Sequence, residues 1–140
     1  MSDIEIAKQC ASIMYDADEA SQMLGITVDI PAPGQAVATM RVRKDMVNGF
    51  DVCHGGIIFA LADTAFAFAC NAYNRLSVGA SANVDFLRAA KLDDELSATA
   101  NEEHRGNRGG IYAVEVVNQH GQTVALFRGR SASRDQSLIK

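Results

Sequence analysis

One long apolar segment with a single carboxylate constrains the fold more than any other feature. Residues 54–74 read HGGIIFALADTAFAFACNAYN, and Asp63 is the only acidic side chain among them. The stretch from Ile57 to Tyr73 is rich in alanine and lacks glycine and proline, which predicts one long central helix. The residues three and four positions from Asp63 are apolar, and so are those on the other faces. Such a helix needs apolar cover on every side.

Strands are predicted on both sides of this helix. Apolar residues alternate with others over 36–43 and over 78–87, and we expect the second stretch to be a half-buried strand. Further strands are predicted over 96–103, 111–119 and 123–131, separated by the turn sequences GNRGG and QHGQ. Residues 4–24 show helical spacing with Gly25 as a stop. The pattern predicts an α+β fold in which a largely antiparallel sheet packs on one dominant helix.

The size of the chain bears on how the central helix is covered. A chain of 140 residues is expected to form a single domain over 1–140, with an N-terminal helical segment over 1–25. Its sheet can wrap only part of a helix that is apolar all round. A second copy of the chain is the simplest further cover, so we expect a homo-oligomer, most simply a symmetric dimer.

Several function classes are disfavoured. A net charge of −4 lacks the basic footprint of nucleic-acid binding, and Asp63 and Thr64 interrupt the apolar run too early for a membrane span. Three cysteines without paired spacing and the absence of an export signal favour the cytoplasm. The histidines lack metal-ligand spacing, so no metal is expected. No GxSxG elbow, Walker A loop or GxGxxG follows a strand.

Asp63 is the first candidate for chemistry. Burial raises the pKa of a carboxyl group toward the range in which a general base works at neutral pH. The structural alternative is a carboxylate that bonds Thr64, a strand hydroxyl or an arginine and fixes the fold. Cys53 beside His54 is a weaker candidate, because adjacent residues on an irregular segment do not build a nucleophile and base pair, and a buried thiol is the better interpretation.

The glycine pair Gly55-Gly56 forms the start of the predicted helix. Its free N–H groups carry partial positive charge and can polarise a carbonyl, although two glycines can also serve only to turn the chain. Gly55 and Asp63 lie eight residues apart, about 12 Å along a helix axis, so they cannot both contact one carbonyl carbon. Two antiparallel copies of the helix would bring them together.

The runs NGFDVCHGGIIFALADTAFAFACN, VDFLR at 84–88 and VALFRG at 124–129 resemble the hotdog-fold acyl-CoA thioesterases of the phenylacetate-degradation PaaI subfamily. The resemblance covers the chain from about Ile26 to Ser131. It implies a hotdog fold, an antiparallel sheet wrapped around one long helix, assembled as dimers or tetramers with active sites between subunits. It also implies hydrolysis of an acyl-CoA, with coenzyme A as part of the substrate and no separate cofactor.

The resemblance assigns roles to individual positions. Asp63 matches the carboxylate that activates water or attacks the thioester, and Gly55 matches the glycine whose N–H polarises the carbonyl. His54 and Asn48 match residues that shape this catalytic site. Expected substrate contacts are Thr64, Ser81, Arg88 and Arg108. Of these, Thr64 has the alternative of bonding back into its own helix. Arg88 and Arg108, with Lys91 and Arg105, are candidates for the coenzyme A phosphates.

The acyl group is open at this stage. The family label points to phenylacetyl-CoA and its ring-hydroxylated relatives, or to a similar aromatic or medium-chain acyl-CoA. Phe59, Phe66 and Phe68 suit an aromatic pocket but fit a hydrophobic core equally well. A non-catalytic acyl-CoA sensor and a hotdog hydratase that uses His54 are the alternative functions, and only a thioesterase would release free coenzyme A.

Overall fold

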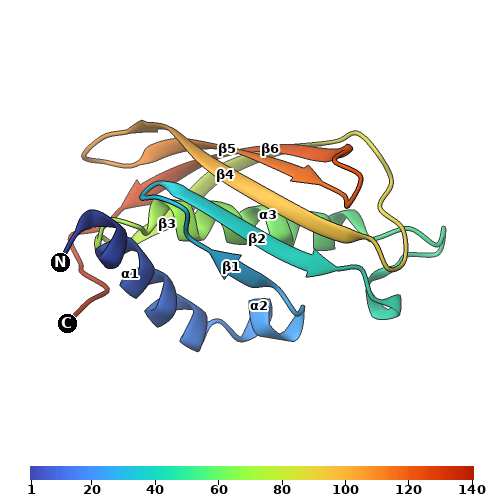
Figure 1. Ribbon diagram of the computed structural model, residues 1–140. Helices are drawn as coiled ribbons and strands as arrows, with labels where there is room; N and C mark the ends of the chain where they lie inside the picture. The colour runs from blue at the N-terminus through green and yellow to red at the C-terminus, as the bar shows by residue number, and fades with distance from the viewer.

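The computed structural model describes residues 1–140 and places one antiparallel sheet over one long helix (Figure 1). The sheet has six strands in the order β1-β2-β4-β5-β6-β3. The long helix, α3, lies mainly against β2, β4 and β5. This arrangement is the hotdog fold that the resemblance implied. In chain order the elements are α1 (Asp3–Ala17), α2 (Glu19–Met23), β1 (Thr27–Asp29), β2 (Gln35–Arg41), the short 3₁₀ helix η1 (Lys44–Met46), α3 (Gly55–Cys70), β3 (Ser77–Phe86), β4 (Glu95–Arg105), β5 (Gly110–Val117) and β6 (Thr123–Ser133).

Small side chains let the sheet approach α3 closely. In β2 and β4 the buried positions alternate along each strand, and Ala36 pairs with Ala100 while Ala38 pairs with Ala98. All four alanines are fully buried, as is Leu61 of α3. The alternation that predicted β2 therefore marks the face that packs on the helix, and the buried positions of β4 follow the same period of two.

The end of α3 differs from the prediction by three residues. The helix stops at Cys70 instead of continuing to Tyr73. The buried Asn71 side chain is responsible, because its Nδ2 donates to the carbonyls of Ala67 and Ser77, both at 2.9 Å. Its Oδ1 accepts the Ser77 N–H at 2.8 Å. These bonds turn the chain directly into β3.

The half-buried strand predicted over 78–87 is wrong for a single chain. β3 is present over Ser77–Phe86, but only Ser77 is buried and only Val84 is half-buried. The reason is its place at the edge of the sheet, where β6 is its only neighbour. Val78 and Phe86 are 40% and 51% exposed. A long edge strand with apolar side chains and unpaired backbone groups is suited to pairing with another chain.

The predicted N-terminal helices and hairpin turns are present. α1 and α2 occupy residues 3–23, and Gly25, with φ of 69°, ends the second helix as the left-handed residue expected there. Gly121 in the QHGQ turn also has a positive φ. None of the helices combines the length and the apolar character that crossing a bilayer requires.

Replacing Gly34 with alanine should destabilise the fold more than the same change at another glycine of similar backbone conformation. Gly34 has φ of 78°, and a Cβ there would lie 2.7 Å from the Tyr73 hydroxyl, which donates to Glu102 at 2.8 Å. Gly121 also has a positive φ, but a Cβ there would contact no other atom. We therefore expect Gly121→Ala to cost about 1 kcal/mol of unfolding free energy. Gly49→Ala has neither penalty. Urea unfolding at one protein concentration measures all three, and equal losses at 34 and 121 would contradict the crowding argument.

Candidate active site

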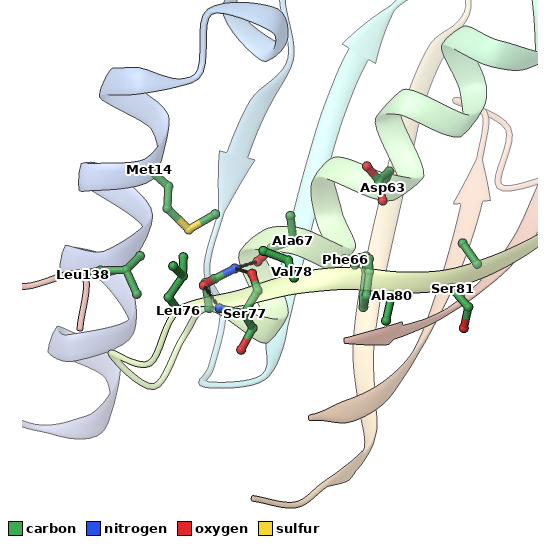
Figure 2. A pocket seen from close by; sticks show the side chains of 13 residues that line it. Met14, Asp63, Phe66, Ala67, Leu76, Ser77, Val78, Ala80, Ser81 and Leu138 are labelled. Atoms are coloured by element: carbon green, nitrogen blue, oxygen red, sulfur yellow. Dashed lines mark hydrogen bonds between the residues drawn. The ribbon is translucent and has the colours of Figure 1, made fainter. Parts of the chain in front are cut away.

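A cavity of about 540 Å³ lies between α3, β3 and the two ends of the chain. Asp63 lies toward one end of it, and Met14 and Leu138 lie toward the other (Figure 2). Most of the remaining wall is apolar. The full lining comprises Met14, Asp63, Phe66, Ala67, Asn71, Leu76, Ser77, Val78, Gly79, Ala80, Ser81, Ala82 and Leu138. A volume of this size is in the range of small-molecule sites.

Asp63 has no hydrogen bond and no ion pair within the chain. Its carboxylate reaches solvent, yet partial burial beside the apolar wall raises the pKa of Asp63 above its ordinary value. The structural alternative required a bond to Thr64, a strand hydroxyl or an arginine, and none is made. An unpartnered carboxylate at the edge of an apolar cavity is a group held available for a ligand or a reaction.

Thr64 lies outside the cavity, although it is next to Asp63 in sequence. Its Oγ1 donates to the Ala60 carbonyl at 2.7 Å and lies 3.5 Å from the Ser21 hydroxyl of α2. Within one chain Thr64 therefore bonds back into its own helix, which was the structural alternative stated for it. It does not line the cavity with Ser81, which belongs to β3.

The uncovered face of α3 carries Asp63. Gly56 and Asp63 are exposed, and Ala60 and Ala67 are half-buried. The four positions follow one another at intervals of four, three and four residues, so they lie on a single face of the helix. Apart from Asp63 they are small, which leaves room for another backbone to approach. Within one chain, α3 is therefore left uncovered along the face that carries its one charged side chain.

Gly55 presents a free N–H at the start of α3. His54 is the N-cap, and its Nδ1 accepts the Gly56 N–H at 3.0 Å, whereas the Gly55 N–H has no acceptor in the chain. A Cβ on Gly55 would lie 3.3 Å from the ring of Phe86, so the start of α3 lies beside the end of β3. Free N–H groups at a helix start form a site that favours a developing negative charge.

Asn48 shapes the loop before α3. Its Oδ1 accepts the N–H of Phe50 at 2.9 Å and that of Val52 at 3.5 Å. Cys53, which follows Val52 in this loop, is buried, and burial raises the pKa of its thiol to about 11. A thiol with so high a pKa is a poor nucleophile, which agrees with the rejection of Cys53 as a catalytic group.

The predicted phosphate contacts lie at opposite ends of one chain. Arg88 follows β3 near the start of α3, since the carbonyl of the nearby Ala90 accepts the Cys53 N–H. Arg108 lies in the hairpin between β4 and β5, where its carbonyl accepts the Ser133 N–H, and Ser133 pairs with Ser77 beside the end of α3. Both arginines are exposed. A single chain therefore does not bring them together.

Some cavity residues were not predicted from the sequence. Of the three phenylalanines considered, only Phe66 lines the cavity, and Phe59 and Phe68 pack in the core. Met14 and Leu138 line it, and neither was expected to do so. Leu138 belongs to a tail without periodic pattern. For Met14, its apolar helical spacing in α1 was a signal of burial but not of a cavity.

Replacing Asp63 with asparagine should stabilise the folded protein at neutral pH. Because the pKa of Asp63 is raised in the folded state, ionisation lowers the free energy of unfolding as pH rises from the pKa of the unfolded chain through the raised one. Below both pKa values this penalty is absent. We therefore expect a higher Tm for Asp63→Asn at neutral pH and a shrinking difference in acid. Asp29→Asn, at an exposed position of β1, controls for the loss of one charge, and a difference independent of pH would refute the assignment.

Proteins of known family resemble the chain closely. The family model described as "Thioesterase superfamily" matches residues 50–125. The acyl-coenzyme A thioesterase PaaI of Escherichia coli is 47% identical over 125 residues, which are 89% of each protein. The structure of Escherichia coli PaaI, from the phenylacetic acid degradation operon, superposes with a TM-score of 0.95 at 44% identity and covers 97% of this chain and 99% of that one. A mutant form of the phenylacetic acid degradation protein PaaI from Thermus thermophilus gives a TM-score of 0.78 at 38% identity, over 84% of this chain and 99% of that one. The chain belongs to the thioesterase superfamily.

Proposed function

We propose that this protein hydrolyses acyl-CoA thioesters to a free acid and coenzyme A. The observation that carries the proposal is Asp63, an ionisable carboxylate without a partner at the edge of an apolar cavity. Membership in the thioesterase superfamily and the close similarity to an acyl-coenzyme A thioesterase support it. The apolar wall would hold the acyl group while the carboxylate meets the thioester carbonyl.

The reaction replaces a C–S bond by a C–O bond. As a general base, Asp63 takes a proton from water while the water oxygen attacks the carbonyl carbon, and the proton then goes to the departing coenzyme A sulfur. As a nucleophile, Asp63 attacks the carbon itself, the C–S bond breaks and coenzyme A leaves as a thiolate, which gives an anhydride. Water then hydrolyses the anhydride, which restores the Asp63 carboxylate, and the proton released goes to the coenzyme A sulfur. Both routes need the ionised carboxylate, and both put negative charge on the carbonyl oxygen. They require only groups of the protein and water.

The donor for that oxygen comes, in this proposal, from a second copy of the chain. Within one helix Gly55 and Asp63 are about 12 Å apart. The start of α3 lies beside the end of β3, and the cavity lies along the first half of β3. If two β3 edges pair antiparallel about a two-fold axis, the start of one α3 comes to the cavity of the other chain. The open edge of β3 and the small-residue face of α3 favour this pairing.

The assembly that follows is a homodimer, or a dimer of such dimers, with active sites between subunits. The same pairing would place the end of β3 of one chain near the start of β3 of the other. Arg88 of one subunit would then approach Arg108 of its partner. We propose these two arginines as contacts for the coenzyme A phosphates, since guanidinium groups bind phosphate well.

The remaining site residues have supporting roles in this proposal. Ser81 borders the cavity in β3, but it pairs with the exposed Arg130, so its hydroxyl lies on the face of the sheet turned away from α3 and is given no substrate contact in this proposal. His54 caps α3 and so presents its glycine start, and Asn48 holds the preceding loop. Thr64 is left with a structural role. The proposed acyl group is phenylacetyl, ring-hydroxylated phenylacetyl or a similar aromatic or medium-chain group, with Phe66 as the aromatic part of the wall. Buried, unpaired thiols suit a cytoplasmic protein.

Two substitutions separate the carboxylate from the N–H donor. Asp63→Asn should reduce kcat by about 10²–10⁴-fold, because it removes the base or nucleophile and keeps the shape. Gly55→Pro should reduce kcat by about 10²–10³-fold, because it removes the N–H while proline is well accepted at the first position of a helix. The residue before a proline favours an extended backbone, and His54 already has one, with φ of −58° and ψ of 133°.

The measurement is release of free coenzyme A from phenylacetyl-CoA and a panel of other acyl-CoAs. Gly55→Ala retains the N–H and adds only the contact with Phe86, so it controls for crowding. Normal turnover by Asp63→Asn would overturn the proposed function. Binding without any release by the unaltered protein would instead favour a sensor, and hydration of an unsaturated acyl chain would favour a hydratase.

Mixing the two inactive variants tests whether the site is shared between subunits. If Asp63 of one chain works with Gly55 of another, a mixed dimer of Asp63→Asn and Gly55→Pro chains holds one intact site. Random reassociation of equal amounts should then restore about a quarter of the normal activity. If both groups of a site belong to one chain, mixing restores nothing. Each variant unfolded and refolded alone is the control.

A further inference from the structure

We propose that the two ends of the chain set the length of acyl group that the cavity accepts. Met14 of α1 and Leu138 of the C-terminal tail form its far wall, and Asn74 positions Leu138. This inference rests on the proposed function, because it takes the cavity beside Asp63 as the acyl site. It names residues that determine specificity and leaves the reaction at Asp63 unchanged.

The cavity has a polar end and an apolar end. Along α3 and its C-cap the wall runs from Asp63 through Ala67 to Asn71, a span of eight residues or about 12 Å. Asn71 is buried and its amide is fully engaged with Ala67 and Ser77, so it offers nothing to a ligand. Beyond this stripe the side chains that point into the cavity are Met14, Leu76 and Leu138 (Figure 2). A thioester at Asp63 therefore directs its acyl group toward these three apolar side chains.

The backbone of the tail is held by hydrogen bonds to the segment between α3 and β3. Asn74 has φ of 57°, and its Oδ1 accepts the N–H groups of both Leu138 and Ile139, at 3.0 and 2.8 Å. The Leu76 N–H donates to the Gln136 carbonyl at 2.8 Å. Leu138 lines the cavity, whereas Ile139, held by the same oxygen, does not. One asparagine side chain therefore fixes which tail residue closes the cavity.

α1 supplies the other part of the wall. The helix is anchored by the fully buried residues Ala7 and Cys10, and burial raises the pKa of the Cys10 thiol above its ordinary value. Met14 is one turn further along the same face and lines the cavity, while its neighbour Ile13 is 40% exposed and does not. Both ends of the chain meet on this side of the molecule (Figure 1).

This wall favours compact acyl groups over long straight chains. A phenylacetyl group is short and ends in a ring, so it can fill the apolar end without displacing Leu138. A long straight chain must push the tail aside and lose its bonds to Asn74. Each methylene that an apolar pocket accepts or rejects changes kcat/KM by about tenfold or more. The end wall is therefore placed to control chain-length preference.

Leu138→Ala is the direct test, with Ile139→Ala as the matched control. Coenzyme A release is measured with phenylacetyl-, hexanoyl-, decanoyl- and palmitoyl-CoA. We expect Leu138→Ala to raise the ratio of kcat/KM for decanoyl-CoA over phenylacetyl-CoA by about tenfold or more. Ile139→Ala should leave the ratio unchanged. Met14→Ala should shift it in the same direction, with Ile13→Ala as its control. Equal ratios for Leu138→Ala and Ile139→Ala would overturn the inference.

Asn74→Gly tests the positioning role without backbone strain, because glycine adopts a positive φ freely. The variant loses both bonds to the tail, so the decanoyl preference should rise as in Leu138→Ala while the phenylacetyl rate stays near normal. A merely structural role would lower both rates together and would contradict the assignment.

A binding measurement keeps this inference separate from the proposed function. Calorimetry with decanoate and phenylacetate measures how tightly each acid binds to the cavity, and it requires no turnover. Tighter decanoate binding by Leu138→Ala than by Ile139→Ala supports the end wall, and equal binding refutes it. If the unaltered protein releases no coenzyme A from any substrate, the proposed function fails, while this comparison still decides whether Leu138 closes the cavity.

Discussion

The burial of α3 governs the rest of the structure. A helix of sixteen residues that is apolar on nearly every face cannot be stable in water, so the chain must provide cover around it. The sheet does this by curving over the helix, with alanines on β2 and β4 at the closest approach. One narrow face is left open, and it holds the only charge of the helix. The fold therefore covers α3 where it is apolar and leaves it accessible where a reaction can occur.

The edge strand β3 links this packing problem to the site. The Asn71 side chain ends α3 and starts β3, so the direction of the strand along the helix is set at one buried residue. As a result, β3 runs back along α3 from Asn71 to Gly55, with the cavity between them. The other edge of β3 has no partner within the chain. In the proposed dimer, a strand that forms the wall of the cavity and also offers a free edge would couple assembly to catalysis.

The central elements could be predicted from the sequence because their patterns are local. Alternation identified β2 and β3, the turn sequences separated β4, β5 and β6, and alanine content identified α3. The rise of a helix predicted that Gly55 and Asp63 of one chain lie too far apart to contact one carbonyl carbon. The exposure of β3 could not be predicted, because alternation does not tell whether an element covers either face. Similarly, the spacing of Arg88 and Arg108 gave no sign that they lie at opposite ends. The place of Leu138 in the cavity could not be predicted, because it depends on hydrogen bonds to the side chain of Asn74, sixty-four residues earlier in the chain.

The two ends of the cavity differ in how strongly packing constrains the residues that form them. Asp63 and Gly55 belong to α3, whose packing, mainly against β2, β4 and β5, tolerates few changes. Met14 comes from α1 and Leu138 from the C-terminal tail, so neither belongs to the sheet or to α3. Substitutions there can reshape the apolar end of the cavity without disturbing the helix that carries the carboxylate. In the proposed enzyme, the acyl group that is accepted could therefore change while Asp63 and Gly55 are kept, because catalysis and acyl-group size are assigned to different segments of the chain.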